Sequence, residues 1–445
     1  MAELSTLRTG IYANDFLDTL PNKNGGYNKE ALDAAFAAAQ AADLPLIIGP
    51  GNWVCDAPIS WTATNARKRQ DIWGYPTGVE VTFNFDNPGA AYWTLNFTGG
   101  SDRYTGVWDG VAVTGNGRKD DKSVALRLDN TKHYEVRNFR PAAVDVGLDF
   151  RNNCFGSNVV NMRTRFSSVN VAINLAGTSS GAQADTGSDL WFTNCWVNGR
   201  RAAVTIEPGG GGYHFLGGQL AAGNDAPSPQ SRGVIECGFD YLHPNYSYLN
   251  SSGNLNDPPQ ASDPKGTPTS VTFDRVTYEG WWDGDILYGW EGAFGFEFRA
   301  CNYNATTKAD RAARGLFTLR DAQRSHLMVT GASRLGGEFR EANMWNISGG
   351  GDIDRFSEDF YSSKLGDYRV AGTSYNFDHA PTPMMLGKFG KGTSRMAKAG
   401  FYYELIYGNL YRSPYNGGTR QKCTNWKTAT QTNPADSNLT WTNVE

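Results

Sequence analysis

The sequence contains no long apolar run, few cysteines and histidines, and no excess of positive charge. No segment approaches the roughly 18–20 consecutive apolar residues of a membrane-spanning helix, and the first residues lack the apolar centre of a signal peptide. The 41 Lys and Arg are balanced by 45 Asp and Glu, whereas binding to a phosphate backbone requires a basic surface. We therefore expect no membrane insertion, no export by the general secretory route and no nucleic acid partner.

Disulfide, metal and nucleotide chemistry also lack their usual motifs. The six cysteines are far apart in the chain, with no CxxC pair, and are expected to be reduced, mostly buried thiols. The five histidines show no spacing typical of metal ligands. The glycine run at 209–212 lacks the lysine and following helix of a phosphate-binding loop. No metal and no other cofactor are therefore expected.

Glycine and aromatic residues, in contrast, are abundant. The chain has 52 glycines and 13% aromatic residues, with only 19% charged residues, a composition typical of extracellular proteins that act on carbohydrate. An apolar fraction of 40% is enough to form a core. At 445 residues the chain exceeds the usual compact domain, which favours several domains or an elongated stack of repeats.

One strong helix and a distinctive turn follow the first 26 residues. Residues 28–42 predict an amphipathic helix with Asn28 as N-cap, and Leu32, Phe36 and Ala39 lie on one face. The next segment, residues 44–54, reads LPLIIGPGNWV. It predicts a strand, a Pro-Gly turn and a second strand.

Two types of short alternating strand then recur in phase, which is the pattern of a solenoid. The first type has the central residues Leu126, Leu148, Ile173, Val204, Ile235, Phe296 and Phe317. The second type occupies residues 133–139, 157–162, 189–195, 213–218, 270–276 and 326–331. An all-β sandwich is the alternative, but the hairpin dipeptides that it requires are scarce. The long gap between Ile235 and Phe296 indicates an excursion from the coil.

These features resemble those of a known family. The helix followed by the strand, Pro-Gly turn and strand is similar to the opening of pectate-lyase-like β-helices, which usually have Asp in place of Asn28 and Tyr in place of Trp53. The helix-capped coil, the interrupted middle rungs and the aromatic C-terminal region, such as residues 401–407, resemble bacteriophage tailspikes over most of the chain.

The resemblance implies an all-β fold, a right-handed parallel β-helix with an N-terminal capping helix and a C-terminal β-rich module. It divides the chain into a virion-attachment arm at 1–26, the β-helix at 27–335, and a trimerisation or receptor-binding module at 336–445. It further implies a homotrimer located in the virion tail, assembled in the host cytoplasm and acting extracellularly. The N-terminus would contact the tail or an adaptor protein, and the ligand would be a host surface polysaccharide.

Paired carboxylates are the candidate catalytic groups. The residue after each central apolar residue should point to solvent, and this column includes Glu236 and Glu297. They would lie about 5 Å apart across one rung or about 10 Å across two, against about 5–5.5 Å in a retaining glycosidase and about 6.5–9.5 Å in an inverting one. The alternative is a solvated ladder of acids balanced by arginines.

Aromatic residues and further acids surround this pair in the sequence. Residues 278–285, YEGWWDGD, place Glu279 and Asp283 beside Trp281 and Trp282, a combination suited to sugar rings. The remaining candidates are Asp240 as an acid and Tyr241 and Trp290 as aromatic contacts. Trp281 and Trp282 could instead cover the coil or form a trimer interface.

The leading hypothesis is a tailspike that binds a capsular or lipopolysaccharide O-antigen chain and cleaves it as an endo-glycosidase. A non-catalytic receptor-binding adhesin with the same fold is the first alternative. A polysaccharide lyase is the second.

Overall fold

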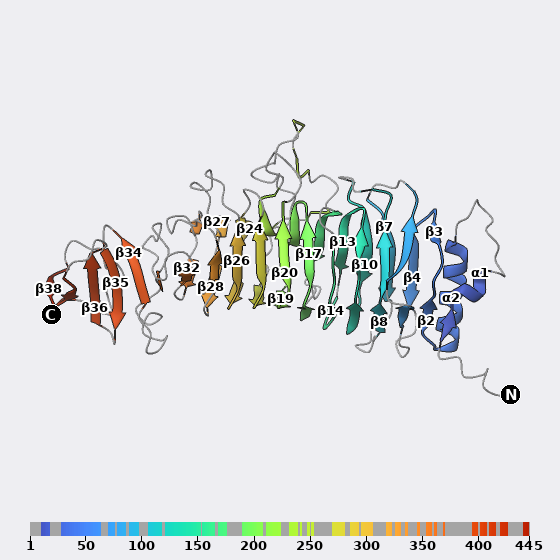
Figure 1. The fold of residues 1–445 in the computed structure, drawn as a ribbon, viewed down its shortest axis with the longest axis horizontal. Coiled ribbons are helices and arrows are strands. Elements are labelled where there is room, and N and C mark those ends of the chain that lie inside the picture. The colour runs from blue at the N-terminus through green and yellow to red at the C-terminus, as the bar shows by residue number, and fades with distance from the viewer. Residues whose placement is uncertain are drawn as a thin grey trace.

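In the computed structural model the chain is an elongated stack of parallel strands, with the capping helix at one end and an antiparallel sheet at the other (Figure 1). The structure describes residues 10–17, 28–63, 70–75, 78–85, 89–97, 106–117, 121–152, 154–164, 168–175, 189–207, 211–223, 231–238, 241–242, 247–249, 251–252, 269–280, 285–292, 295–305, 317–322, 325–330, 334–336, 345–347, 353–357, 360–362, 368–369, 394–398, 401–406, 409–414, 419–425 and 439–444.

A complete rung of the coil contributes one strand to each of three faces, taken in chain order. Face 1 is a twelve-stranded sheet made of β1 (Ile11–Tyr12), β2 (Leu46–Ile48), β5 (Ile72–Gly74), β8 (Gly106–Asp109), β11 (Tyr134–Arg137), β14 (Asn158–Val160), β16 (Leu190–Thr193), β19 (Gly211–Leu216), β22 (Thr269–Asp274), β25 (Gly295–Arg299), β28 (Ser325–Thr330) and β31 (Ile353–Ser357).

Face 2 consists of two consecutive sheets joined by the bridge between Arg163 and Trp196. Its first sheet has four strands, β3 (Trp53–Cys55), β6 (Val79–Phe83), β9 (Val111–Thr114) and β12 (Pro141–Ala142). Its second sheet has seven strands, β17 (Trp196–Gly199), β20 (Gln219–Ala222), β23 (Thr277–Gly280), β26 (Asn302–Ala305), β29 (Arg334–Gly336), β32 (Phe360–Ser362) and β33 (Tyr368–Arg369).

Face 3 completes each rung as a ten-stranded sheet. Its strands are β4 (Ile59–Ala63), β7 (Ala91–Phe97), β10 (Val124–Asp129), β13 (Val144–Arg151), β15 (Val169–Leu175), β18 (Ala202–Ile206), β21 (Gly233–Cys237), β24 (Asp285–Gly292), β27 (Phe317–Ala322) and β30 (Trp345–Ile347). The architecture confirms the predicted right-handed parallel β-helix, the hand that parallel crossovers adopt.

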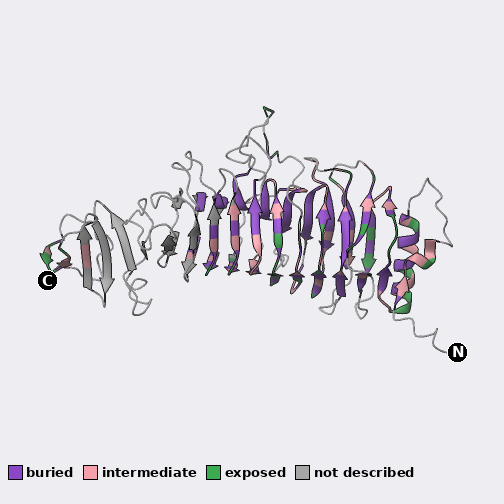
Figure 2. Ribbon diagram, viewed as in Figure 1, coloured by how far each residue is buried: buried purple, intermediate pink, exposed green. Residues whose placement is uncertain are grey.

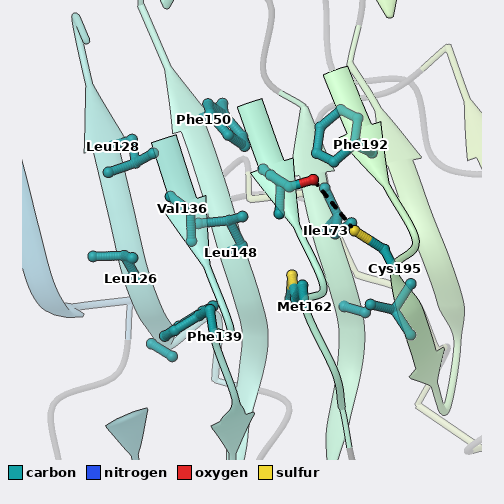
Figure 3. Close-up of a cluster of buried hydrophobic side chains, with 14 of the residues drawn as sticks. Leu126, Leu128, Val136, Phe139, Leu148, Phe150, Met162, Ile173, Phe192 and Cys195 are labelled. Carbon is teal, nitrogen blue, oxygen red and sulfur yellow. Dashed lines mark hydrogen bonds between the residues drawn. The ribbon is translucent and has the colours of Figure 1, made fainter. Parts of the chain in front are cut away.

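The strands of the coil carry many buried residues (Figure 2). The core is a set of inward columns that stack apolar side chains from rung to rung (Figure 3). Leu126, Leu148 and Ile173 occupy one position on successive strands of face 3 and are fully buried. On face 1, Phe192 and Phe215 stack with their ring centroids 4.4 Å apart, and further phenylalanines continue the column. A rung cannot bury this inner face alone, so stacking of neighbours supplies the hydrophobic free energy.

The turn from face 1 to face 2 uses a left-handed backbone residue in rung after rung. Asn138, Asn161 and Asn194 have φ values of 51°, 57° and 52°, a conformation that asparagine tolerates better than most residues. The Asn161 side-chain amide donates to the Asn138 amide oxygen at 2.6 Å. These asparagines therefore set the sharp corner of the coil.

The helix α2 (Lys29–Ala42) closes the first rung, and a short helix α1 (Asn14–Leu17) lies beside it (Figure 1). Leu32, Phe36 and Ala39 are buried as predicted. Asn28 occupies the N-cap position, but its side chain makes no capping hydrogen bond. Its Oδ1 instead accepts from the backbone N–H of Val54 at 2.7 Å, which ties the helix to β3.

Parallel pairing continues beyond residue 335, through β31 on face 1 and β32 on face 2. The coil is therefore longer than the sequence predicted. An antiparallel sheet follows, formed by β34 (Ser394–Lys398), β35 (Phe401–Ile406), β36 (Asn409–Pro414), β37 (Gln421–Cys423) and β38 (Trp441–Asn443). In the part of the chain that the structure describes, no helix is long and apolar enough to span a membrane.

All six cysteines are buried and unpaired, as predicted. Burial raises the pKa of Cys154 to about 11 and that of Cys195 to about 12. Cys154 and Cys195 therefore stay protonated at neutral pH and act as small core residues.

The predicted register was wrong at one strand. The strand with Phe296, β25, belongs to face 1, where Phe296 pairs with Val271 and Leu327. The rung after Ile235 on face 3 is supplied by β24, in which Leu287 pairs with Ile235. The apolar and polar residues of β25 alternate as they do in the strands of face 3, which led to the wrong assignment. In β24 the acids, glycines and tryptophan interrupt that alternation, so the strand was not recognised.

Candidate functional site

Glu236 is fully buried on the outer side of face 3. Its carboxylate accepts from the Arg232 guanidinium at 3.1 Å, the Arg232 backbone N–H at 3.0 Å and the Tyr248 hydroxyl. Burial raises its pKa, although Arg232 and the Tyr248 hydrogen bond oppose this. The sequence predicted that the residues after the central apolar positions are exposed to solvent. This was wrong at Glu236, which lies on the outer side of the strand but is buried.

The cover over face 3 comes from the excursion after β21. Tyr241 and Tyr248 are buried and pack in one cluster with the outward residues Val124, Val146 and Val171. The Tyr248 ring lies between two guanidinium groups, those of Arg201 and Arg232, each 4.4 Å from the ring centroid. The excursion thus folds back onto the coil and removes the outward column from water.

A second buried polar network lies further along the same strands. Asp149 accepts from Arg127 at 2.7 Å, Arg151 at 3.1 Å and Asn174 at 2.8 Å. Burial alone would raise the pKa of Asp149, but the two arginines and the amide outweigh it and lower the pKa. Arg151 also binds Glu207 at 2.9 Å. Arginines therefore balance the charges of Asp149 and Glu207, as in the predicted alternative of a ladder of acids. The ladder was expected to be solvated, whereas these two acids are buried.

The predicted acids that the structure describes lie on three different faces. Glu236 is on face 3, where its neighbour in the next rung is Tyr288 rather than Glu297. Glu297 is on face 1, pairs with Arg299 at 2.5 Å, and lies beside Thr272. Glu279 is on face 2, beside Ala221 and Asn304. The predicted stacking of Glu236 and Glu297 on one face was therefore wrong.

The other predicted residues divide into two groups. Asp240, Trp281, Trp282 and Asp283 lie outside the described residues. Tyr241 is buried, and Trp290 is partly buried against the cluster that contains Tyr241. The catalytic and substrate-binding roles assigned to these residues and to Glu236, Glu297 and Glu279 stay predictions.

A different site is visible on face 2. An open groove of about 760 Å³ runs over β6, β9 and β12. Its lining residues are Gly78, Glu80, Ala112, Thr114, Arg140, Pro141, Ala142, Ala143, Arg163, Thr164 and Ser168. The size lies in the range of small-molecule and oligosaccharide pockets, about 300–1,000 Å³.

The groove follows a single outward column across successive rungs. Glu80 pairs with Ala112, and Arg140 occupies the next rung because Pro141 pairs with Val113. Arg163 and Trp196 follow as bridge partners. Adjacent strands of a sheet lie about 4.8 Å apart, so these side chains repeat at that spacing along the coil axis.

Trp196 is not one of the residues that line the groove, but it is the bridge partner of Arg163, which is, and so it lies in the next rung. Its side chain is 52% exposed, whereas most large aromatic residues of the described coil are buried. Thr164 and Ser168 add polar side chains to the groove itself. At the opposite end, the Thr114 hydroxyl donates to Glu80 Oε1 at 2.6 Å. The groove therefore combines two guanidinium groups, hydroxyl groups and a carboxylate, and an exposed indole lies in the rung beyond it.

Sequence analysis missed this groove because face 2 strands are short. The strand β12 has two residues, too few to show alternation. A signal was nevertheless present, since each corner asparagine is followed by one core residue and one outward residue. The repeats Asn138-Phe139-Arg140, Asn161-Met162-Arg163 and Asn194-Cys195-Trp196 show it.

Sequence comparisons identify no relative, because no family model and no curated protein matches. Among solved structures, ORF18 of Geobacillus virus E2 matches with a TM-score of 0.56 at 12% identity, over 98% of this chain and 76% of that one. The gp42 tailspike of Acinetobacter phage vb_AbaP_AS12 gives 0.48 at 10% identity, over 97% and 84%. The enzymatically active domain of tailspike protein 4 of bacteriophage CBA120 gives 0.46 at 12%, over 94% of this chain and 56% of that domain. At 12% identity the likeness to ORF18 bears on the fold alone, and it agrees with the fold described above: the chain is a right-handed parallel β-helix.

Proposed function

We propose that this chain is a receptor-binding tailspike that holds a bacterial surface polysaccharide in the face 2 groove. The observation that carries the proposal is the open groove together with the exposed indole of Trp196, which lies one rung beyond Arg163. The tailspike setting, with a homotrimer in the virion tail attached through the N-terminus, is part of the same proposal and comes from the sequence resemblance.

The chemistry of the groove suits a sugar chain. The apolar face of a pyranose ring packs on a flat aromatic side chain, while its hydroxyl groups exchange hydrogen bonds with hydroxyl and guanidinium groups. The outward column repeats along the coil axis at about 4.8 Å per rung, which is close to the length of one sugar unit. An extended polysaccharide lying along the axis would therefore meet one outward side chain per unit.

Binding is better supported than cleavage in this groove. Glycoside hydrolysis uses two carboxyl groups about 5–9.5 Å apart. Among the described residues that line the groove, Glu80 is the single acid. Endo-glycosidase activity is the second candidate function, because the raised pKa of Glu236 is the property of a general acid. Such activity would require the excursion that carries Tyr248 to uncover Glu236.

The test of the binding proposal is a panel of purified capsular and lipopolysaccharide chains, measured by biolayer interferometry with the full-length protein. We expect at least one polysaccharide to bind, and Trp196→Ala to weaken that binding about tenfold or more, equivalent to about 1.4 kcal/mol. Trp191→Ala is the matched control, because Trp191 is 39% exposed on face 1 and stacks on His214. Absence of binding across the panel, or equal losses in both variants, would contradict the proposal.

The same panel tests cleavage through the appearance of new reducing ends. If the acids predicted from sequence are catalytic, Glu236→Gln, Glu297→Gln and Asp283→Asn each abolish cleavage while Trp196-dependent binding remains. Binding without product would exclude endo-glycosidase activity and support the non-catalytic adhesin. Cleavage that persists in all three variants would exclude these acids as the catalytic groups.

A further inference from the structure

We infer that the face 2 groove selects an acidic polysaccharide, whose negatively charged groups bind Arg140 and Arg163. This inference rests on the proposed function, since it names the class of polysaccharide that the groove takes. It is carried by the position, exposure and pairing of these two arginines.

The two arginines lie on consecutive rungs. The backbone N–H of Arg163 donates to the carbonyl of Phe139 at 3.0 Å, so Arg163 lies directly beside the turn that carries Arg140. Both side chains are exposed and both line the groove. With rungs about 4.8 Å apart, the pair forms a cationic stretch that neighbouring acidic groups on one sugar chain can reach together.

Several other arginines of the coil pair with its own acids. Arg127 binds Asp149, Arg137 binds Glu135 and Arg299 binds Glu297. In the groove the pattern changes. Among the described residues no carboxylate pairs with Arg140 or Arg163, and the contact of Arg163 Nε is the neutral amide oxygen of Asn161, at 3.3 Å.

The single acid of the groove does not neutralise the pair. Glu80 pairs with Ala112, which separates it from Arg140 by two rungs, or about 10 Å. Its Oε1 also accepts the Thr114 hydroxyl. The groove is thus polar along its length, with a negative end at Glu80 and a positive stretch that continues to Trp196.

This arrangement favours carboxylate or similar oxygens over neutral sugar. Hydrogen bonds between a guanidinium and an anionic oxygen are about twice as strong as those between neutral groups. The chain as a whole has a net charge of −4, so it does not attract polyanions generally. A polyanion bound here is held by a local positive field, and its binding must weaken as salt increases.

The experiment compares each acidic polysaccharide of the panel with its carboxyl-reduced, neutral form, at low and at physiological salt. We expect the acidic form to bind at least tenfold more tightly, and Arg140→Gln combined with Arg163→Gln to abolish that preference. Arg140→Lys with Arg163→Lys should retain part of it. Arg137→Gln is the control, because Arg137 is also exposed but pairs with Glu135 on face 1.

The outcomes separate the two proposals. Equal binding of the acidic and reduced forms, or an unchanged preference in the double glutamine variant, overturns the inference while Trp196-dependent binding keeps the proposed function. If no polysaccharide binds, the proposed function itself fails. Circular dichroism of each variant shows that the coil is intact, and because both side chains are exposed, the lysine variant provides a second folded comparison.

Discussion

The most unusual single residue is Asp145, which lies under the excursion on face 3 and is 1% exposed. It accepts from the Tyr241 hydroxyl at 2.9 Å, the Asn170 amide at 2.8 Å and the backbone N–H of Lys122 at 2.7 Å. Burial raises its pKa to about 6, against the opposing effects of Arg201 and these hydrogen bonds. The hydrogen bond from Tyr241, which joins the excursion to the coil, therefore ends on a carboxyl group whose pKa is raised to about 6.

Asp145→Asn should change how stability depends on pH. With a folded-state pKa of about 6 and a usual value of 3.8, the folded state binds more protons than the unfolded state between these values. Stability contributed by this group therefore rises as pH falls from about 7 to 4. We expect the unfolding free energy of the wild type, relative to the variant, to increase by on the order of 1–3 kcal/mol over that range.

Thermal unfolding of both proteins at a series of pH values measures this difference. The acid Asp149, whose pKa is lowered, is present in both proteins and cancels in the comparison. A difference between the two proteins that stays constant from pH 7 to 4 would show that Asp145 has an ordinary pKa.

At the scale of elements, corner residues turn the chain from one face to the next, and strands form the faces of each rung. The corner asparagines adopt positive φ, and the strands supply the inward columns. Asn194 isolates the corner effect, because it is exposed, has φ of 52° and donates its backbone N–H to Leu216 at 2.9 Å. No hydrogen bond from its side chain to another described residue is present.

Asn194→Ala should destabilise the coil by about 1 kcal/mol, because an alanine side chain disfavours the left-handed backbone by about 1–2 kcal/mol. Asn194→Gly should be nearly neutral, since glycine adopts this backbone without steric cost. Chemical denaturation of the two variants measures the contrast. Asn158→Ala, at an exposed strand position on β14, is the control for loss of an asparagine. Equal effects of alanine and glycine at position 194 would contradict a conformational role.

At the scale of the whole molecule, the antiparallel sheet β34–β38 follows a coil of parallel strands. β34 and β38 are the edge strands of that sheet within one chain. Edge strands present unpaired backbone groups and are usually covered in a stable protein. A homotrimer, which the sequence resemblance implies, would cover such edges between chains.

Light scattering coupled to gel filtration should therefore give a mass three times that of the 48.7 kDa chain. The mass should stay constant over a hundredfold range of concentration, because a trimer that covers these edge strands between chains should not dissociate readily. A mass of one chain, or a mass that varies with concentration, would exclude a stable trimer.

The sequence alone determined the coil, because its evidence is local and periodic. The capping helix follows from Leu32, Phe36 and Ala39 at helical spacing, and two of the three faces follow from alternating strands long enough to show period two. The third face was missed because strands such as β12 are too short. The wrong placement of β25 arose because strands of different faces share one apolar pattern.

The tertiary structure decided which residues meet and which see water. Glu236 follows a central apolar residue and so points outward, yet Tyr241 and Tyr248, in the excursion that follows β21, bury that surface. Conversely, Arg140, Arg163 and Trp196 each follow a corner asparagine by two positions in the sequence, but they become one column only when successive rungs stack. Periodicity along a chain encodes the direction of a side chain, whereas its exposure depends on segments that fold over it from elsewhere.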